Sequence, residues 1–362
     1  MVETRTVNAK RKLDQPGALD PRAEALLGWY DRHRRVLPWR ALPGEAANPY
    51  HVWLSEIMLQ QTGVETVKPY FEKFLARWPN VTALAGAEDQ ALLAAWAGLG
   101  YYARARNMIA CARTVAGTLG GVFPDTEAGL QALPGIGGYT AAAIAAIAFG
   151  RPAVVMDGNI ERVIARIAAI STPLPAAKPE IRAVLAPMVP KDRPGDFAQG
   201  LMDLGSGICT PRNPECLICP LQGFCAASKA GEATRYPVKL KRKAKPVKFG
   251  VAYVVHDGNG NILLRSRPGK GLLAGMAEVP NGGWAEGAAP VSLPPIDAEW
   301  RILNASVVHV FTHFELRLSV HRAEVKTLSA VPDGARWVCL AELDHEPLPT
   351  LFRKVIEAAL SR

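Results

Sequence analysis

Apolar residues return every three or four positions along the first two-thirds of the chain. Segments 23–34 (AEALLGWYDRHR) and 90–119 (QALLAAWAGLGYYARARNMIACARTVAGTL) show this spacing, which is typical of helices that bury one face. Proline and glycine interrupt it at LPGIGG, STPLPAAKP and VPKDRPG, where helix boundaries and turns are expected. The pattern predicts an all-α domain over residues 21–227.

The pattern changes after a basic segment. Residues 228–248 carry eight Lys or Arg against a single Glu, too polar a stretch to form a core, so we interpret it as a basic linker. Short β-like runs follow at 250–257, 261–268, 305–325 and 335–343, separated by turn signals such as DGNG at 257–260. We therefore predict a second, α+β domain over residues 249–362, and a disordered basic tail over residues 1–20.

Length and charge agree with a two-domain protein that binds a polyanion. The 362 residues exceed one ordinary domain, and a net charge of +9 favours phosphate backbones, because Lys and Arg displace their counterions. No apolar run is long enough to span a membrane, and the polar N-terminus lacks the apolar run of an export signal. We expect a cytoplasmic protein without a membrane partner.

Four of the six cysteines lie within 17 residues, in the spacing C-x6-C-x2-C-x5-C from position 209 to position 225. A reducing compartment makes a disulfide framework unexpected here. Four thiolates in a compact loop suit a structural zinc ion or an iron–sulfur cluster. Ligand count and chemistry alone leave both alternatives open.

A second motif is the sequence LPGIGGYT at 133–140, which precedes an alanine-rich helical run and then VVMDGN at 154–159. Gly135 and Gly137 let backbone amides approach a phosphate at a helix N-terminus, where unsatisfied N–H groups favour an anion. Such a contact holds the DNA backbone without reading its bases. An ordinary corner between two helices is the alternative.

A third motif, WLSEIMLQQT at 53–62, sets one carboxyl group, that of Glu56, among apolar residues. If Glu56 lies in a cleft, desolvation raises its pKa and keeps it protonated, as a general acid requires. A solvated helix residue is the alternative.

Taken together, these motifs resemble the MutY-type adenine DNA glycosylases of the helix-hairpin-helix (endonuclease III) superfamily. The cysteine spacing is similar to the loop that holds a [4Fe-4S] cluster there, and WLSEIMLQQT and LPWR at 37–40 resemble the MutY acid segment and pocket. The resemblance implies an adenine DNA glycosylase of base excision repair, bacterial and monomeric. It would flip adenine mispaired with 8-oxoguanine or guanine out of double-stranded DNA and hydrolyse its N-glycosidic bond.

The resemblance also implies the site residues. Glu56 would be the acid and Asp157 the anion that faces the sugar, with Tyr139 and Asn159 orienting them. Tyr139 occupies the position where endonuclease III-like relatives carry a nucleophilic lysine, so the enzyme is expected to be monofunctional and to leave an abasic site. The cluster ligands would be Cys209, Cys216, Cys219 and Cys225. The substrate- and DNA-binding residues would be Trp39, Arg40, Leu59, Gln60, Gln61, Thr62, Tyr101, Gly135, Gly137, Gln199, Phe311, Thr312 and His313.

The roles of two of these residues are also supported by direct chemical arguments. An aromatic wedge such as Tyr101 offsets the unstacking cost of base flipping, and the Gln199 amide can pair with adenine N6 and N7. The strand pattern after residue 249 resembles the MutT (Nudix) fold without its metal-binding run of glutamates, so that domain is expected to recognise the lesion. Its FTH at 311–313 resembles the MutY Phe-Ser-His motif, with Thr312 in place of serine.

Three alternatives remain beside this interpretation. The chain could be an endonuclease III-like or thymine-mismatch glycosylase of the same superfamily, which would share the cluster and Asp157. It could be a non-catalytic, redox-sensing DNA-binding protein. A nucleotide-pyrophosphate hydrolase is disfavoured by the missing glutamates. The loop between Arg40 and Asn48 is about four residues longer than the family pattern, and its path is not predicted.

Overall fold

The computed structural model describes residues 19–240, 244–304, 306–325 and 331–361. Residues 1–18 of the predicted N-terminal tail (1–20) lie outside the described residues. The chain divides into two compact units. We call the first, residues 1–75, 80–82 and 111–241, the helical unit, and the second, residues 76–79, 83–110 and 242–362, the sheet unit.

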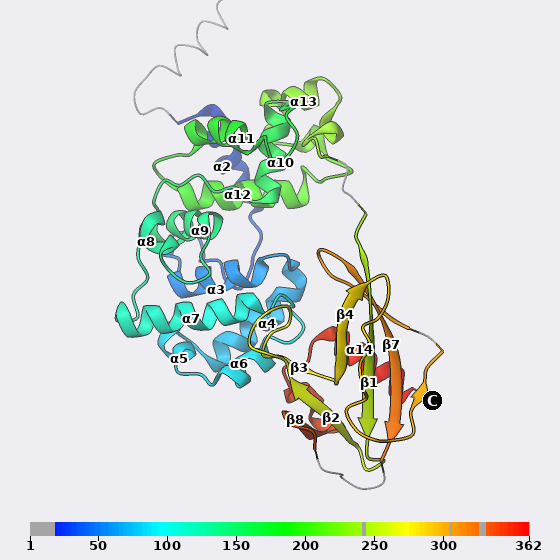
Figure 1. The fold of residues 1–362 in the computed structure, drawn as a ribbon. Helices are drawn as coiled ribbons and strands as arrows, with labels where there is room; N and C mark the ends of the chain where they lie inside the picture. The colour runs from blue at the N-terminus through cyan, green and yellow to red at the C-terminus, as the bar shows by residue number, and fades with distance from the viewer. Residues whose placement is uncertain (1–18, 241–243, 305, 326–330, 362) are drawn as a thin grey trace, which may run out of the picture. The chain divides into compact units, whose positions relative to one another are not determined.

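Every named element between residues 21 and 235 is a helix, and the first strand begins at Val247 (Figure 1). The α-helices are α2 (Pro21–His33), α3 (Pro49–Leu59), α4 (Val64–Arg77), α5 (Val81–Ala85), α6 (Asp89–Ala95), α7 (Ala103–Thr118), α8 (Glu127–Gln131), α9 (Gly138–Phe149), α10 (Gly158–Ile167), α11 (Lys178–Leu185), α12 (Pro194–Gly207), α13 (Ala226–Lys229) and α14 (Thr350–Leu360). The 3-10 helices are η1 (Ala186–Met188), η2 (Cys216–Ile218), η3 (Gln222–Phe224), η4 (Ala233–Arg235) and η5 (Leu340–His345).

Helix α9 is one of the buried helices of the helical unit. Residues 140–146 of this helix are all buried, as expected for a helix that is apolar around its whole circumference. It ends at Gly150, whose φ of 62° gives the left-handed turn that commonly stops a helix. Its many alanines allow close approach, and α9 packs against α3, α8 and α12.

Helix α12 connects the parts of the helical unit, because it packs against α2, α9 and α10. Its contact with α9 depends on Gly195. A Cβ atom at that position would lie 2.7 Å from the carbonyl oxygen of Ala146 and 2.8 Å from Cα of Ile147. Two helix backbones can approach this closely only where the side chain is absent.

Residues 228–241 of the predicted linker belong to the helical unit. The end of α13 and the 3-10 helix η4 lie within the linker, Tyr236 is 7% exposed, and the amide of Leu174 donates to the carbonyl of Val238 over 2.9 Å. The chain between Arg40 and Asn48 forms a loop in which the amide of Glu45 donates to the carbonyl of Leu42.

The sheet unit contains one mixed sheet of eight strands. The path β3-β2-β1-β7-β5 is extended by β4 on β1, β6 on β7 and β8 on β2, and among the described strands β1 and β7 are the one parallel pair. Helix α14 packs against β1, β6 and β7 and covers one face with apolar side chains (Figure 1). The strands are β1 (Val247–His256), β2 (Asn261–Ser266), β3 (Ala277–Glu278), β4 (Asn281–Glu286), β5 (Arg301–Ile302), β6 (Val307–Val310), β7 (Glu315–Glu324) and β8 (Ala335–Cys339).

The run at 305–325, interpreted as one β-like stretch, forms two strands joined by a turn. Strand β6 pairs antiparallel with β7, and the amide of Phe311 donates to the carbonyl of Phe314 over 2.8 Å. The residues FTHF therefore form the turn of a hairpin. Strand β4 was not predicted, because its sequence NGGWAE contains two glycines and little apolar alternation. None of the described helices is long and apolar enough to cross a membrane.

We predict that Gly195→Ala destabilises the protein by about 1–3 kcal/mol, because the added methyl group forces α9 and α12 apart. Gly207→Ala is the matched control on the same helix, since a Cβ there meets no atom within 4 Å; it should change stability by no more than about 1 kcal/mol. Thermal unfolding of both variants measures the difference. Equal melting temperatures would contradict the close packing at Gly195.

Candidate active site

A pocket opens beside Glu56, which lies on α3 and is only 6% exposed. Helix α3 begins where the side chain of Asn48 accepts a hydrogen bond from the amide of Tyr50 over 2.9 Å, with Pro49 in the first turn. Both residues favour a helix start. The pocket is lined by Arg35, Leu37, Trp39, Arg40, Val52, Ser55, Glu56, Leu59, Val64, Ile147, Gln199 and Met202.

Four of the residues predicted to bind substrate thus share this pocket with Glu56. They are Trp39, Arg40, Leu59 and Gln199. The ring of Trp39 meets that of Phe71 edge-on, at 5.4 Å between centroids. Mostly apolar walls with a few polar groups are typical of a pocket that binds a flat, weakly polar ligand.

The surroundings of Glu56 raise its pKa to about 7, so that a large fraction of the carboxyl groups keep their proton at neutral pH. Burial is the largest cause; a hydrogen bond from Tyr139 lowers the pKa, the negative charge of Asp157 raises it and the charge of Arg40 lowers it. Burial dominates because a carboxylate out of water loses its hydration. A carboxyl group with this pKa can act as a general acid at neutral pH.

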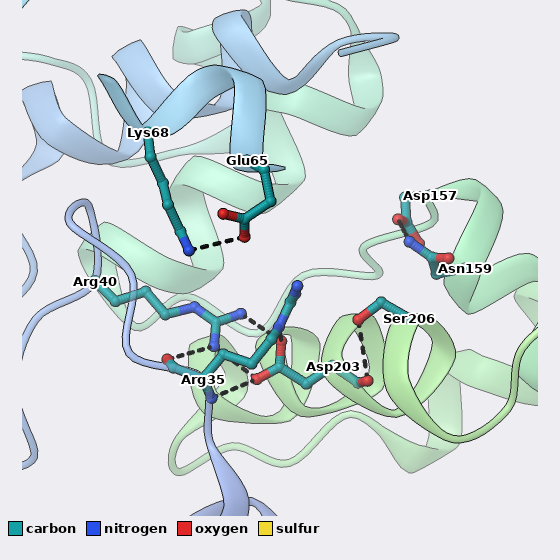
Figure 2. A network of polar contacts seen from close by, with 8 residues as sticks. All are labelled: Arg35, Arg40, Glu65, Lys68, Asp157, Asn159, Asp203 and Ser206. Atoms are coloured by element: carbon teal, nitrogen blue, oxygen red, sulfur yellow. Dashed lines mark hydrogen bonds and ion pairs between the residues drawn. The ribbon is translucent and has the colours of Figure 1, made fainter. Parts of the chain in front are cut away.

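Asp157 is held differently, at the N-terminus of α10. As the N-cap residue, its Oδ1 accepts from the amide of Ile160 over 2.7 Å, and its Oδ2 accepts from the side chain of Asn159 over 2.9 Å (Figure 2). Burial raises the pKa of Asp157, but these hydrogen bonds and the charge of Arg162 oppose the shift. Donors aimed at a carboxylate favour its ionised form.

Tyr139 connects the two carboxyl groups from the first turn of α9. Burial raises the pKa of Tyr139 well above its ordinary value, and the charges of Glu56 and Asp157 act in the same direction. The neutral phenol therefore donates to Glu56. The predicted residues Glu56, Tyr139 and Asp157 accordingly form one interacting group.

The hairpin residues lie at the start of α9. Gly135 has a φ of 75°, and Gly137 is the N-cap of α9, with open space where a Cβ would be. A phosphate could approach the helix N-terminus there. The Gln60 amide donates to Thr140 Oγ1 over 3.3 Å and so ties the end of α3 to the hairpin.

Gln61 and Thr62 follow directly after α3. Gln61 is exposed with a φ of 58°, a left-handed conformation that is uncommon for residues other than glycine. The hydroxyl of Thr62 donates to the carbonyl of Gln60 over 3.4 Å. Neither residue is among those that line the pocket beside Glu56.

Two charged residues at the pocket were not predicted from the sequence. Arg35 lines the pocket, and Asp203 on α12 binds both Arg35 and Arg40 (Figure 2). Asp203 lies within the segment FAQGLMDLG, which also contains Gln199. Its carboxylate in a mostly apolar segment was the sequence feature that could have identified it.

The four cysteines of the loop line one cavity together with Arg166. Among the described residues, no group of three or more His, Cys, Asp or Glu side chains is arranged to hold a metal ion. Four thiols around a common cavity fit an iron–sulfur cluster, which is held by cysteine thiolates. Cys209, Cys216, Cys219 and Cys225 would hold it.

Two arginines of α10 join this loop to the candidate catalytic residues. Arg166 is 1% exposed and donates to Cys209 Sγ over 3.2 Å and to the carbonyls of Thr210 and Tyr236. Arg162 donates to the carbonyl of Cys209 over 2.8 Å and to Oδ1 of Asn159 over 2.9 Å. Because Asn159 in turn binds Asp157, hydrogen bonds run from the cysteine loop to that carboxylate.

The remaining predicted residues lie in the sheet unit. The hydroxyl groups of Tyr101 and Thr312 lie 2.9 Å apart within hydrogen-bonding distance. Tyr101 has a φ of 48° and is 46% exposed, and Thr312 and His313 are exposed in the hairpin turn. Phe311 stacks on Trp284, with centroids 5.7 Å apart.

Comparison with known proteins shows which family has this combination. Residues 54–187 match the HhH-GPD superfamily of base excision DNA repair proteins, residues 209–225 match the iron-sulfur binding domain of endonuclease III, and residues 251–358 match the NUDIX domain. The adenine DNA glycosylase of Mus musculus is 33% identical over 91% of this chain and 76% of its own length. That of Homo sapiens is 33% identical over 91% of this chain and 72% of its own.

The chain belongs to the adenine DNA glycosylase family. A solved structure described as a thermostable thymine-DNA glycosylase is similar to part of the chain, with a TM-score of 0.52 and 27% sequence identity. The match covers 58% of this chain and 97% of that protein. The predicted fold, a helix-hairpin-helix domain followed by a Nudix-like domain, is confirmed. The chain is a DNA N-glycosylase of base excision repair that binds DNA and carries an iron–sulfur cluster, as predicted.

We predict that the melting temperatures of the wild-type protein and Glu56→Gln diverge as the pH rises from about 4.5 to about 7. The pKa of Glu56 rises from 4.5 to about 7 on folding, so the folded state holds an extra proton in this window and loses stability as the pH increases through it. The glutamine variant has no such loss. Thermal unfolding across this range measures the difference.

Glu65→Gln is the matched control, because the Glu65 side chain is 83% exposed. Its melting temperature should stay at a constant offset from the wild type at every pH. A constant offset for Glu56→Gln as well would show that the Glu56 carboxyl is not desolvated.

Proposed function

We propose that this enzyme removes adenine paired with 8-oxoguanine or with guanine, by hydrolysis, and leaves an abasic site without cutting the strand. The observation that carries the proposal is the pair Glu56 and Asp157: burial raises the pKa of both carboxyl groups, to about 7 for Glu56, and Asp157 also accepts hydrogen bonds from Asn159 and from the amide of Ile160, which favour its ionised form. Glycosidic bond cleavage needs an acid for the leaving group and an anion for the positive sugar.

The proposed chemistry uses each group in turn. Glu56 gives its proton to N7 of the flipped adenine as the bond between N9 and C1′ breaks, so that the base leaves neutral. The carboxylate of Asp157 stabilises the positive charge on the sugar. Glu56, now ionised, accepts a proton from the water that attacks C1′. Tyr139 holds Glu56 by its hydrogen bond, and Asn159 holds Asp157.

The absence of strand cleavage is argued from Tyr139. A glycosylase that cuts the strand needs an amine that attacks C1′ and forms a Schiff base. No lysine lines the pocket beside Glu56 within the described residues, and a phenol with a raised pKa is a poor nucleophile. Water is therefore the proposed nucleophile.

We predict that, among four duplexes, only those with adenine opposite 8-oxoguanine or guanine are cleaved, and only after alkali treatment opens the abasic site. The other two carry thymine opposite guanine and an oxidised pyrimidine. Single-turnover rates measure excision, and untreated samples report strand cutting. Glu56→Gln should slow excision by about 10²–10⁴-fold, because the amide cannot donate the proton.

Each alternative has its own signature in this assay. Excision of thymine or of the oxidised pyrimidine would replace the proposal with another glycosylase of the superfamily. Strand cutting without alkali would overturn the monofunctional mechanism.

We further propose that the turn at 311–314 reads the base opposite adenine. Support comes from the contact between the hydroxyls of Thr312 and Tyr101 and from the aromatic and basic groups around the turn. Lys245 donates to the carbonyl of Phe311 over 2.8 Å, and Lys248 lies over the ring of Phe314 at 4.8 Å. Cations beside stacked rings suit a nucleic-acid surface.

We predict that Thr312→Val lowers the preference for 8-oxoguanine over guanine by roughly tenfold to a hundredfold. The two bases differ at N7 and C8, and one discriminating hydrogen bond is worth about 1–3 kcal/mol. The ratio of excision rates on the two adenine duplexes measures the preference. Thr312→Ser keeps the hydroxyl and should keep the ratio. An unchanged ratio in Thr312→Val would remove this turn from lesion reading.

A further inference from the structure

Asp203 binds two arginines at the wall of the base pocket (Figure 2). Its Oδ1 accepts from Arg35 Nε over 2.6 Å and from Arg40 Nη2 over 2.9 Å, and its Oδ2 accepts from Arg40 Nη1 over 2.6 Å and from the Arg35 amide over 3.1 Å. Four N–H donors thus meet two oxygen atoms. The Asp203 side chain is 2% exposed and that of Arg40 is 6% exposed.

The two arginines belong to the pocket that contains Glu56. Arg35 and Arg40 both line it, and the charge of Arg40 acts on the Glu56 carboxyl. A buried guanidinium without an anion is strongly unfavourable. Asp203 therefore determines where Arg40 lies, and it comes from a helix that contributes Gln199 and Met202 to the same wall.

We propose that Asp203 is a positioning residue for base excision: it fixes Arg35 and Arg40 at the pocket wall and offsets their positive charge, so that Glu56 keeps its proton. The proposal rests on the role of Glu56 as the acid in the proposed function. The pocket beside Glu56 then combines the acid with two cations, part of whose charge Asp203 offsets.

The groups that face Glu56 act in opposite directions. From α9, Tyr139 donates a hydrogen bond, and from the start of α10, Asp157 adds a negative charge. From the segment before α3, Arg40 adds a positive charge, and Arg35 lines the same pocket. A positive charge favours the ionised carboxylate. With Asp203 neutral, both arginines would act uncompensated, and Glu56 would lose its proton at a lower pH.

The test compares single-turnover excision rates between pH 5.5 and pH 9 for the wild type, Asp203→Asn and Asp203→Glu. We expect the rate of the wild type to fall as Glu56 ionises. In Asp203→Asn this fall should begin about one pH unit lower, which makes the variant about tenfold slower at high pH and close to wild type at low pH. Asp203→Glu keeps the charge and should keep the wild-type profile.

A double variant separates charge from structure. Arg40→Gln combined with Asp203→Asn removes one cation and its anion together, and we expect the pH of the fall to return towards the wild-type value even where the overall rate is lower. It also avoids an unpaired buried charge, so it is informative if Asp203→Asn alone does not fold. A rate for Asp203→Asn that is lower by the same factor at every pH would overturn the proposal and leave a purely structural role.

The proton on Glu56 can also be followed without catalysis. Infrared difference spectroscopy detects the carbonyl stretch of a protonated carboxyl group, assigned here by its loss in Glu56→Gln. This band should disappear at a lower pH in Asp203→Asn than in the wild type. If the wild type does not excise adenine but the band shifts as expected, the proposed function fails while the role of Asp203 stands. If excision occurs and the band does not shift, the proposed role of Asp203 fails while the proposed function stands.

Discussion

A carboxyl group that is taken out of water tends to keep its proton, because its ionised form loses hydration. The candidate active site of the helical unit depends on one such group, that of Glu56. Glu56 is buried on a helix that otherwise packs into the core, and the cost of ionising it there raises its pKa to about 7. The dry pocket also strengthens every charge that faces it, since low polarity reduces screening. The positions of Asp157, Tyr139 and Arg40 therefore matter more here than they would at the surface.

The framework that holds Tyr139 and Asp157 is formed by three helices, of which α12 contacts both others. Helix α9 supplies Tyr139, the N-terminus of α10 supplies Asp157, and α12 packs against both. The N-cap role of Asp157 has a second effect, because a residue that starts a helix has its side chain fixed by the backbone it caps. The orientation of the candidate anion is thus set by secondary structure and not by a flexible side chain alone.

Much of the site was readable from the sequence, for reasons that differ by residue. Glu56 stood out as one carboxyl group in an apolar segment, and the cysteine spacing is a local pattern that survives any detail of packing. Asp203 and Arg35 were missed, because they meet across 168 positions of sequence. Local pattern reasoning has no access to such a pair.

The sheet shows the same limit. Strands β1, β2 and β8 lie in short apolar runs, whereas β4 contains two glycines and takes its place through pairing with β1. The break in the run at 305–325 was invisible, since FTHF reads as strand in composition. Its amide-to-carbonyl contact between Phe311 and Phe314 closes the turn. Tertiary pairing, and not propensity, decided both features.

The two arginines of α10 place positive charge beside the cysteine loop. Arg162 and Arg166 stand one helical turn apart, where like charges repel, and both donate to the carbonyl of Cys209. A thiolate-bound cluster is an anion, and the cysteines that would hold it lie against this pair of cations. Helix α10 therefore has its positive charge balanced from two sides, by the loop at one end and by Asp157 at the other. In this sense the cluster site and the carboxylate of Asp157 carry the counter-charges of the same short helix.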